Sequence, residues 1–344
     1  MNPSAPQGTP APAIDIHTHF VPEQLALRPG GAAENTWPSM AQAQSCGHRN
    51  VMVAGSVYRT VTDQCWSAPR RIIDMAGNGT THQVLSPMPE LLSYWLPARD
   101  AQVLLRDINE QIAKLVADHP QHFSGLAAVP LQDVDMAIAE LEYAKNTLNL
   151  TGVEIGSNIN GRPVGAPEFD AFFAAAVRLD MPVFVHAQRP ANPERLIGPA
   201  ALEAALGFPN EIGISAASAI TGNLLLRNPT LRIAFSHGGG SLAMLLPRLQ
   251  HAWHVFPAIR ESMPVAPLEQ AQKLFFDTLV YEKTALRYLV ERFGDQRLMI
   301  GTDYPFAILE TDPIKRLEEA GFDAATLARL RHDNAARFLS GRAD

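Results

Sequence analysis

The residues of this sequence best suited to chemistry are histidines and one aspartate that follow short apolar runs. The first run ends in a His-Thr-His triplet, and later runs end at three further residues, His186, His237 and Asp303. Since alternate residues of a strand point to the same face, His17 and His19 are expected to project together. Three imidazoles and a carboxylate suit zinc, with iron, cobalt or manganese as alternatives. Bound zinc would lower the pKa of its water toward about 7, which supplies hydroxide at neutral pH.

Eight apolar runs that alternate with helical patterns would position these residues. Most runs are nearly continuous in apolar residues, which is typical of strands buried on both faces. The predicted strands span residues 13–19, 82–87, 123–129, 152–157, 182–187, 231–237, 274–278 and 297–303. Helical periodicity lies between them, for example over residues 100–117, 134–148, 169–179 and 284–293. Eight repeats of this kind predict an α/β fold, a closed (β/α)₈ barrel of the TIM type, whose active site lies at the carboxyl ends of the strands.

The other segments fit one barrel domain made by the whole chain, residues 1–344. Residues 21–67 are rich in Gly, Ala, Ser and Gln, and they are predicted to form a small insertion, with a hairpin, that caps the barrel mouth. Residues 190–228 exceed one normal connection and are predicted to hold two helices. Residues 1–12 lack the basic and apolar regions of a signal peptide and are predicted to be a flexible leader.

Composition narrows the class of protein. Hydrophobic residues make up 47% of the chain and charged residues 18%, which predicts a large core and little disorder. The net charge of −7 argues against nucleic acid as the main partner, although a local basic pocket could still hold an anionic substrate. The sequence contains no run of 18 apolar residues, so we predict no membrane span. The two cysteines do not make a disulfide framework, so we expect free thiols and a cytoplasmic enzyme.

Motifs at the ends of the predicted strands resemble the amidohydrolase superfamily. They are the His-Thr-His triplet, His186, a His-Gly-Gly-Gly run and Gly-Thr-Asp-Tyr-Pro-Phe. The resemblance covers nearly the whole chain and is closest to the amidohydrolase-2 group, in particular its 2-amino-3-carboxymuconate 6-semialdehyde decarboxylases. It implies one zinc ion held by His17, His19, His186 and Asp303, and it makes His237 the acid/base instead of a tight ligand. Asp303 then belongs to the catalytic residues as well. Gly238–Gly240 would let the backbone approach the metal, or would form a simple turn.

The resemblance also implies residues that bind the substrate. Arg59, in the predicted insertion, matches an arginine that binds a substrate carboxylate, for which guanidinium is well suited. Arg248 matches an arginine supplied by the neighbouring subunit, which implies a homodimer. It lies three turns along a helix, roughly 16 Å from the metal end of its own strand. Trp253 and Phe306 match family positions too, with ordinary packing as the alternative.

Two segments at the rim of the predicted pocket depart from these decarboxylases. Ala187-Gln188-Arg189 stands in place of Pro-Trp, and Ala-Ile-Leu-Glu follows the Asp-Tyr-Pro-Phe motif in place of Pro-Leu-Gly-Glu. The exact substrate therefore stays open. Arg189 is either a further contact for an anion or a charge on the rim. Glu154, at the end of the fourth strand, is either a partner of the metal ligands or half of a buried ion pair.

Three functions are compatible with these residues. The first is non-oxidative decarboxylation of a small unsaturated or aromatic carboxylate, with no organic cofactor. In that reaction metal-bound hydroxide and His237 would handle the proton that the substrate carbon gains as CO₂ leaves. The second is hydrolysis of an amide, a lactone or a C–C bond at the same site. The third is a non-catalytic barrel with a structural metal, against which an open coordination position would argue, because structural zinc sites are closed.

Overall fold

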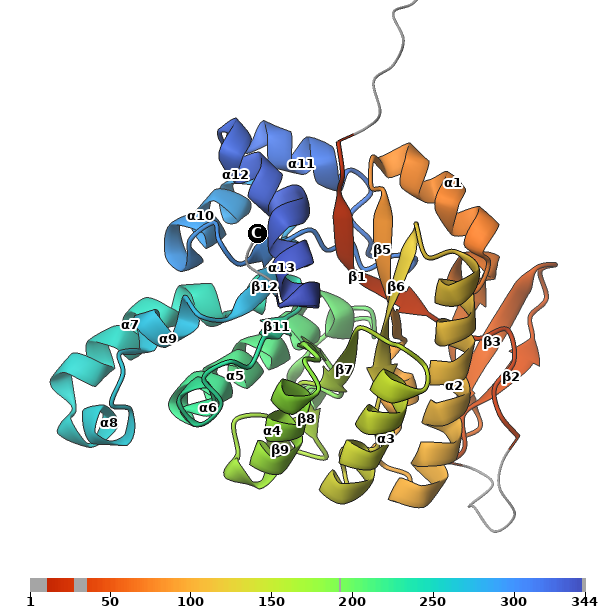
Figure 1. The fold of residues 1–344 in the computed structure, drawn as a ribbon, viewed down its shortest axis with the longest axis horizontal. Coiled ribbons are helices and arrows are strands. Elements are labelled where there is room, and N and C mark those ends of the chain that lie inside the picture. The colour runs from red at the N-terminus through yellow and green to blue at the C-terminus, as the bar shows by residue number, and fades with distance from the viewer. Residues whose placement is uncertain (1–10, 28–35, 192, 342–344) are drawn as a thin grey trace, which may run out of the picture.

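The computed structural model describes residues 11–27, 36–191 and 193–341 of the chain. Eight parallel strands form one sheet in the order of the chain, and helices surround it (Figure 1). Parallel bridges from Asp15 to Ile300 and from Thr18 to Tyr304 join the last strand region to the first. These strands are β1 (Ile14–Phe20), β5 (His82–Pro87), β6 (Phe123–Ala128), β7 (Gly152–Gly156), β10 (Val183–His186), β11 (Ile233–Phe235), β12 (Phe275–Asp277) and β13 (Leu298–Met299). The predicted (β/α)₈ barrel is therefore confirmed.

Each predicted strand has its counterpart in the barrel, although the later strands are shorter than predicted. The prediction of residues 297–303 reduces to the two residues of β13, after which the chain pairs with β1 only through isolated bridges at Ile300 and Tyr304. A shift of register in β1, between Asp15 and Thr18, has a consequence for the site. Such a bulge re-aims the side chains that follow it. Ile14 and Ile16 pack in the barrel interior, and the shift lets His17 face the interior as well.

The helices begin and end where the local sequence favours it. The Ser67 hydroxyl accepts a hydrogen bond from the backbone N–H of Arg70 at the start of the first helix, which ends at Gly79 with a φ of 80°. The segment predicted to hold two helices contains α5 and α6, and a π-helical turn, Glu203–Gly207, leads into α5. The helices are α1 (Ala68–Asn78), α2 (Ala98–Asp118), α3 (Val134–Asn146), α4 (Asp170–Arg178), α5 (Phe208–Thr221), α6 (Leu224–Arg227), α7 (Leu242–Val255), α8 (Pro257–Ser262), α9 (Pro267–Ala271), α10 (Lys283–Phe293), α11 (Pro313–Glu319), α12 (Ala324–Ala328) and α13 (Asn334–Ser340).

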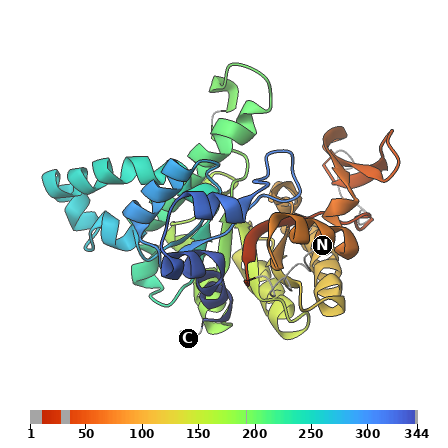
Figure 2. The ribbon, with the colours of Figure 1, turned by 90° about the horizontal axis from the view of Figure 1, so that it is seen from above.

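A small antiparallel sheet of three strands lies between β1 and α1. Its strands are β2 (Ser39–Gln42), β3 (His48–Val53) and β4 (Ser56–Thr62). In Figure 2 this sheet and the segment before α5 rise on the same side of the molecule. A two-stranded hairpin, β8 (Asn158–Ile159) and β9 (Arg162–Pro163), follows β7. The predicted leader, residues 1–12, lies outside the described residues except for its last two.

The core has two parts, one inside the barrel and one between the strands and the helices. The inner part takes a side chain such as Val84 or Phe184 from every barrel strand except β7, and Phe338 of α13 packs on Phe275 with ring centroids 5.2 Å apart. This packing fills the barrel below the site and leaves the carboxyl ends of the strands free. Cys46 and Cys65 are both free thiols, as predicted. In the described part of the chain, every helix is too short or too polar to cross a bilayer.

Candidate metal centre and active site

Four side chains converge where β1, β10 and β13 end. They are His17, His19, His186 and Asp303, and one ligand atom from each lies within 4.8 Å of all the others. The Nε2 atoms of His17 and His19 are 3.2 Å apart, and Asp303 Oδ1 lies 2.9 Å from His19 Nε2. Donors about 2.0–2.1 Å from a tetrahedral ion would be separated by roughly 3.3 Å. The spacing of these atoms therefore fits one metal ion.

The hydrogen bonds and protonation of three of these residues, His186, His19 and Asp303, also fit a metal. The Nε2 atom of His186 is buried and has no hydrogen-bond partner among the described residues, which leaves its lone pair for a ligand. Burial lowers the pKa of His186 well below its usual value and that of His19 to about 4, so both imidazoles are neutral. Burial opposes ionisation of Asp303, but hydrogen bonding to His19 and the charge of His17 lower its pKa to about 2. Neutral imidazoles and an ionised carboxylate are the forms that bind a divalent metal.

Asp277, at the end of β12, orients this centre, and sequence reasoning did not identify it. His17 Nδ1 donates a hydrogen bond to Asp277 Oδ2 at 2.7 Å, which directs the opposite ring nitrogen toward the other ligands. Burial alone would lower the pKa of His17, but the hydrogen bond and charge of Asp277 raise it to about 9. Asp277 also accepts the backbone N–H groups of His237 and Gly238, at 2.9 and 2.7 Å. The sequence did carry a signal for Asp277, because an acidic residue follows a predicted strand there, as it does at Asp303.

The variant Asp277→Asn is expected to weaken metal binding by roughly 10–100-fold, the usual effect of losing such a partner. The amide cannot supply the negative charge that makes the His17 imidazole basic, and its NH₂ group would face backbone donors. Competition with a chelator measures the affinity. Asp180→Asn is the matched control, because Asp180 is 63% exposed and pairs only with Arg232 among the described residues. Equal affinities in the two variants would contradict the role of Asp277.

His237 lies beside the four converging residues but is not one of them. Its ring centroid is 5.3 Å from that of His17 and 5.2 Å from that of His186. It lines the cavity, and its Nδ1 lies 3.0 Å from the Ser236 hydroxyl. Burial and the nearby charge of His17 lower the pKa of His237 to about 4. This imidazole is therefore neutral and faces the space where a substrate would react.

The glycines after His237 allow close packing, and Gly240 also lines the cavity that contains His186 and Asp303. All three have a positive φ, and a side chain at Gly239 would lie 2.7 Å from the Phe276 ring. A side chain at Gly240 would collide with the Pro209 carbonyl of α5. The alternative, a strand-to-helix turn that only glycine can make, describes this segment.

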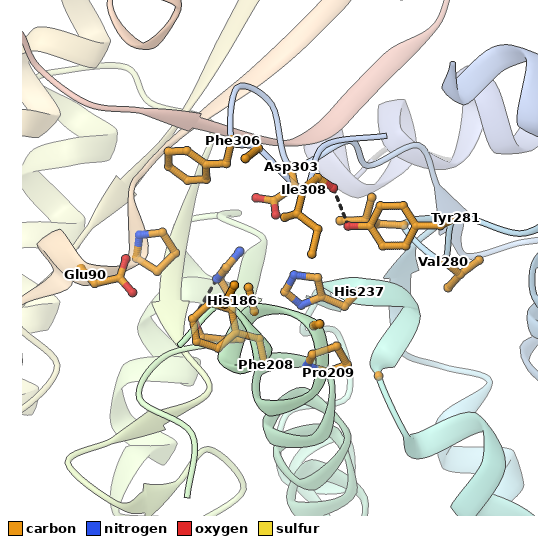
Figure 3. Close-up of a pocket in the computed structure, with 18 of the residues that line it drawn as sticks. Glu90, His186, Phe208, Pro209, His237, Val280, Tyr281, Asp303, Phe306 and Ile308 are labelled. Atoms are coloured by element: carbon orange, nitrogen blue, oxygen red, sulfur yellow. Dashed lines mark hydrogen bonds between the residues drawn. The ribbon is translucent and has the colours of Figure 1, made fainter. Parts of the chain in front are cut away.

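A cavity of about 600 Å³ opens above the metal centre (Figure 3). His186, His237 and Asp303 form its floor, while His17 and His19 are fully buried beneath. Most of its wall is apolar, with Phe208, Pro209, Leu279, Val280, Phe306 and Ile308. The hydroxyl of Tyr281 is held by the Ile308 carbonyl at 2.7 Å. The cavity therefore suits a small molecule with a flat or apolar body.

Arg59 and Phe306, both predicted to contact substrate, line this cavity. Phe306 stacks on His19 with ring centroids 4.9 Å apart, and the Arg59 guanidinium lies 4.0 Å from the Phe306 ring centre. The Arg59 Nε atom is buried and has no hydrogen-bond partner among the described residues. Arg59 thus brings a cation to the wall of the cavity, where its charge acts on Glu90 and Tyr58.

The other three predicted contacts lie away from the cavity of their own chain. Arg189 is exposed, lines a neighbouring hollow and stacks on Trp95 at 3.9 Å. Trp253 packs against the core, and its indole N–H donates to the Met263 carbonyl at 2.8 Å. Arg248 is exposed on α7. For Trp253 the alternative of ordinary packing describes its position. The position of Arg189 fits the alternative of a charge on the rim, and Glu90 of the cavity lies within reach of this charge.

Glu154 is fully buried at the end of β7. Both of its carboxyl oxygens lack a hydrogen-bond partner among the described residues, and no cation of this part of the chain pairs with it. Burial raises the pKa of Glu154 to about 8, so the group is neutral at pH 7. The expectation of a buried ion pair is therefore wrong.

Comparisons with known proteins agree with this geometry. The family model described as "Amidohydrolase" matches residues 14–341. The chain is 31% identical over 328 residues to 2-amino-3-carboxymuconate-6-semialdehyde decarboxylase of Dictyostelium discoideum, covering 95% of this chain and 91% of that protein.

Two solved structures resemble the fold. The IDCase of Metarhizium anisopliae is 20% identical, with a TM-score of 0.81 and coverage of 95% of this chain and 97% of that chain. A 5-carboxyvanillate decarboxylase of Novosphingobium aromaticivorans, solved with bound manganese and a nitrobenzoic acid, is 25% identical. Its TM-score is 0.68, with coverage of 78% and 80%.

Proposed function

This chain belongs to the amidohydrolase family, and on that premise we propose that it is a metal-dependent decarboxylase of a small unsaturated or aromatic carboxylate. The observation that carries the proposal is the position of the metal centre. Two of its four ligands, His186 and Asp303, lie at the floor of an apolar cavity, and one arginine lines the wall. A relative 31% identical over nearly the whole chain is a decarboxylase. A structural metal would instead be enclosed by protein ligands, with no cavity above it.

The cavity lining favours a substrate with one carboxylate and a flat body. Arg59 is the one arginine or lysine among the described residues that line the cavity, and it would bind the carboxylate. Apolar side chains such as Leu279 and Ile308 would contact a ring or a diene. Burial of the substrate between these walls would exclude water and strengthen its interactions with charged groups.

His237 is proposed to move the proton that decarboxylation requires. One substrate carbon gains a proton, its bond to the carboxylate carbon breaks, and CO₂ leaves as that electron pair restores conjugation. A neutral imidazole at the cavity floor can accept a proton and pass it to the carbon. A bound divalent metal would supply Lewis-acid stabilisation of the negative charge that develops on the substrate. Asp277 holds the backbone of His237 and thereby fixes the position of the imidazole.

We propose zinc as the native ion, since three imidazoles and one carboxylate suit it, with manganese, iron or cobalt as alternatives. Elemental analysis of protein purified from its source without added metal tests this. Zinc at about one equivalent per chain in active protein is the expected result. Active protein that contains another of these metals instead would contradict zinc.

Incubation with aromatic carboxylates and muconates is expected to release CO₂ from at least one of them. The product carbon that loses the carboxylate should then carry one proton from the solvent. Headspace CO₂ and deuterium content in heavy water are the measurements. Hydrolysis of an amide, a lactone or a C–C bond would instead add the oxygen of labelled water to a product. Labelled oxygen with no CO₂, across esters, amides and carboxylates, would contradict decarboxylation.

We also propose that the active form is a homodimer in which Arg248 reaches the partner's cavity. Arg248 is exposed on α7, and so are two apolar residues of the same helix, Met244 at 70% and Leu245 at 48%. Isologous packing of this helix would bury these apolar side chains and give two identical sites.

Complementation tests the shared site. Arg248→Ala and His237→Ala, each inactive alone, are expected to regain activity after subunit exchange. In a mixed dimer one site carries both defects and the other carries neither, so up to half of the sites in mixed dimers should work. Exchange is followed with differently tagged chains. Proven exchange with no recovery would show that Arg248 does not act in the partner's cavity.

A further inference from the structure

A second acidic side chain, Glu90, lines the cavity apart from the metal ligand Asp303. It belongs to a short 3₁₀ turn, Pro89–Leu92, that follows β5. Figure 3 shows its carboxyl group turned toward the cavity, on the opposite side of the view from Tyr281. Most of the surrounding wall is apolar, and a polar group in such a place is costly unless it has a partner. The contacts of Glu90 therefore indicate which kind of group it binds.

One side chain of the protein donates a hydrogen bond to one of the two oxygens of this carboxyl. The Tyr58 hydroxyl of β4 donates a hydrogen bond to Glu90 Oε1. No other side chain of the described residues donates a hydrogen bond to this carboxyl, and the positive charges that act on it, those of Arg59 and Arg189, form no direct salt bridge with it. Burial raises the pKa of Glu90. An oxygen that can accept a hydrogen bond is thus left for a molecule in the cavity.

Glu90 and Arg59 lie on the same wall, and the charge of Arg59 favours the ionised form of Glu90, although the two side chains form no direct salt bridge. Arg59 follows Tyr58 in the chain, and its guanidinium lies over Phe306, which in turn stacks on the metal ligand His19. Sites that leave a polar group to be paired by substrate discriminate strongly against analogues that lack the matching group, because the protein atom then stays unpaired. The wall offers a cation for a carboxylate and, beside it, an acceptor for a hydrogen-bond donor.

We propose that Glu90 is a specificity-determining residue, whose free oxygen accepts a hydrogen bond from a hydroxyl or amino substituent of the substrate while Arg59 binds its carboxylate. This inference rests on the proposed function and narrows its substrate to hydroxy- or amino-substituted unsaturated or aromatic carboxylates. On this proposal the substrate is selected by its hydroxyl or amino group, which donates a hydrogen bond to Glu90, and not by its carboxylate alone.

Calorimetry with the metal-loaded enzyme tests the inference. The probes are benzoate, its three monohydroxy isomers and its three monoamino isomers, each measured for Kd. At least one substituted isomer is expected to bind roughly 10–100-fold more tightly than benzoate, the effect of one hydrogen bond to a buried or charged group. Glu90→Met is expected to reduce this ratio to within about twofold while benzoate affinity persists, which also shows that the variant is folded.

Three further variants sharpen the test. Glu90→Gln keeps an oxygen acceptor and should retain part of the ratio. Tyr58→Phe should retain the ratio, because Glu90 remains. Glu142→Met is the matched control, since Glu142 is 43% exposed and pairs with Arg178 on the surface. Loss of the ratio in Tyr58→Phe but not in Glu90→Met would overturn the inference and make the Tyr58 hydroxyl the contact.

The result can be separated from that of the proposed reaction, because binding of these probes needs no turnover. An unchanged ratio in Glu90→Met, in an enzyme that releases CO₂, would overturn the role of Glu90 alone. A ratio that depends on Glu90, in an enzyme that releases no CO₂ from any probe, would support the contact and count against decarboxylation.

Discussion

His237→Ala is expected to lower the rate of CO₂ release by roughly 10²–10⁴-fold, the usual contribution of a positioned acid or base. The same variant should keep about one equivalent of metal per chain. His237 lines the cavity, and it is not one of the four side chains whose ligand atoms converge within 4.8 Å. Removal of its ring takes away the proton carrier and leaves those donors in place. Steady-state kinetics and elemental analysis of the same sample measure the two quantities.

His332→Ala is the matched control, because His332 is half-exposed, contacts Asp333 at the surface and does not line the cavity. It should leave both the rate and the metal content unchanged. A His237→Ala protein that loses its metal would contradict the assignment, because His237 would then be a ligand. A protein that retains full activity would show that the proton is moved by another group.

His17→Ala, in contrast, is expected to lose both the metal and the activity. Its imidazole contributes one of the four converging donors, and its other nitrogen is the partner of Asp277 at 2.7 Å. The variant therefore removes a ligand and leaves a buried carboxylate without its imidazole, which is costly. Metal content after dialysis, measured beside the His332→Ala control, should fall to background. Stoichiometric metal in His17→Ala would show that the centre lies elsewhere.

The barrel and the metal centre could be predicted because both depend on local patterns. Apolar runs of strand length recur with helices between them, and a barrel brings the ends of all its strands to one mouth. His186 and Asp303 are far apart in the chain, yet each follows such a run and so lies in the same place. The same rule applied to the run that ends near Asp277 would have identified this aspartate, whose role depends on its contacts.

Residues outside the strands were harder to predict, because their positions depend on how separate segments meet. Glu90 lies in a turn after β5 and is paired with Tyr58 from the three-stranded sheet, a contact that no spacing in the sequence indicates. Arg189 follows a metal ligand closely, but its backbone has a φ of 42°, and its side chain turns onto Trp95, away from the cavity. A resemblance between motifs transfers the position of a residue but not the direction of its side chain.

Titration of the metal-free enzyme with zinc or manganese, with CO₂ release as the readout, tests the central claim most directly. The four converging residues predict one ion per chain, and the proposed function makes that ion necessary for the reaction. Activity should therefore be absent without metal, rise in proportion to added metal and stop rising at one equivalent per chain. CO₂ release at full rate from metal-free protein, or a rise that continues to two equivalents, would contradict a decarboxylase that uses this single metal centre.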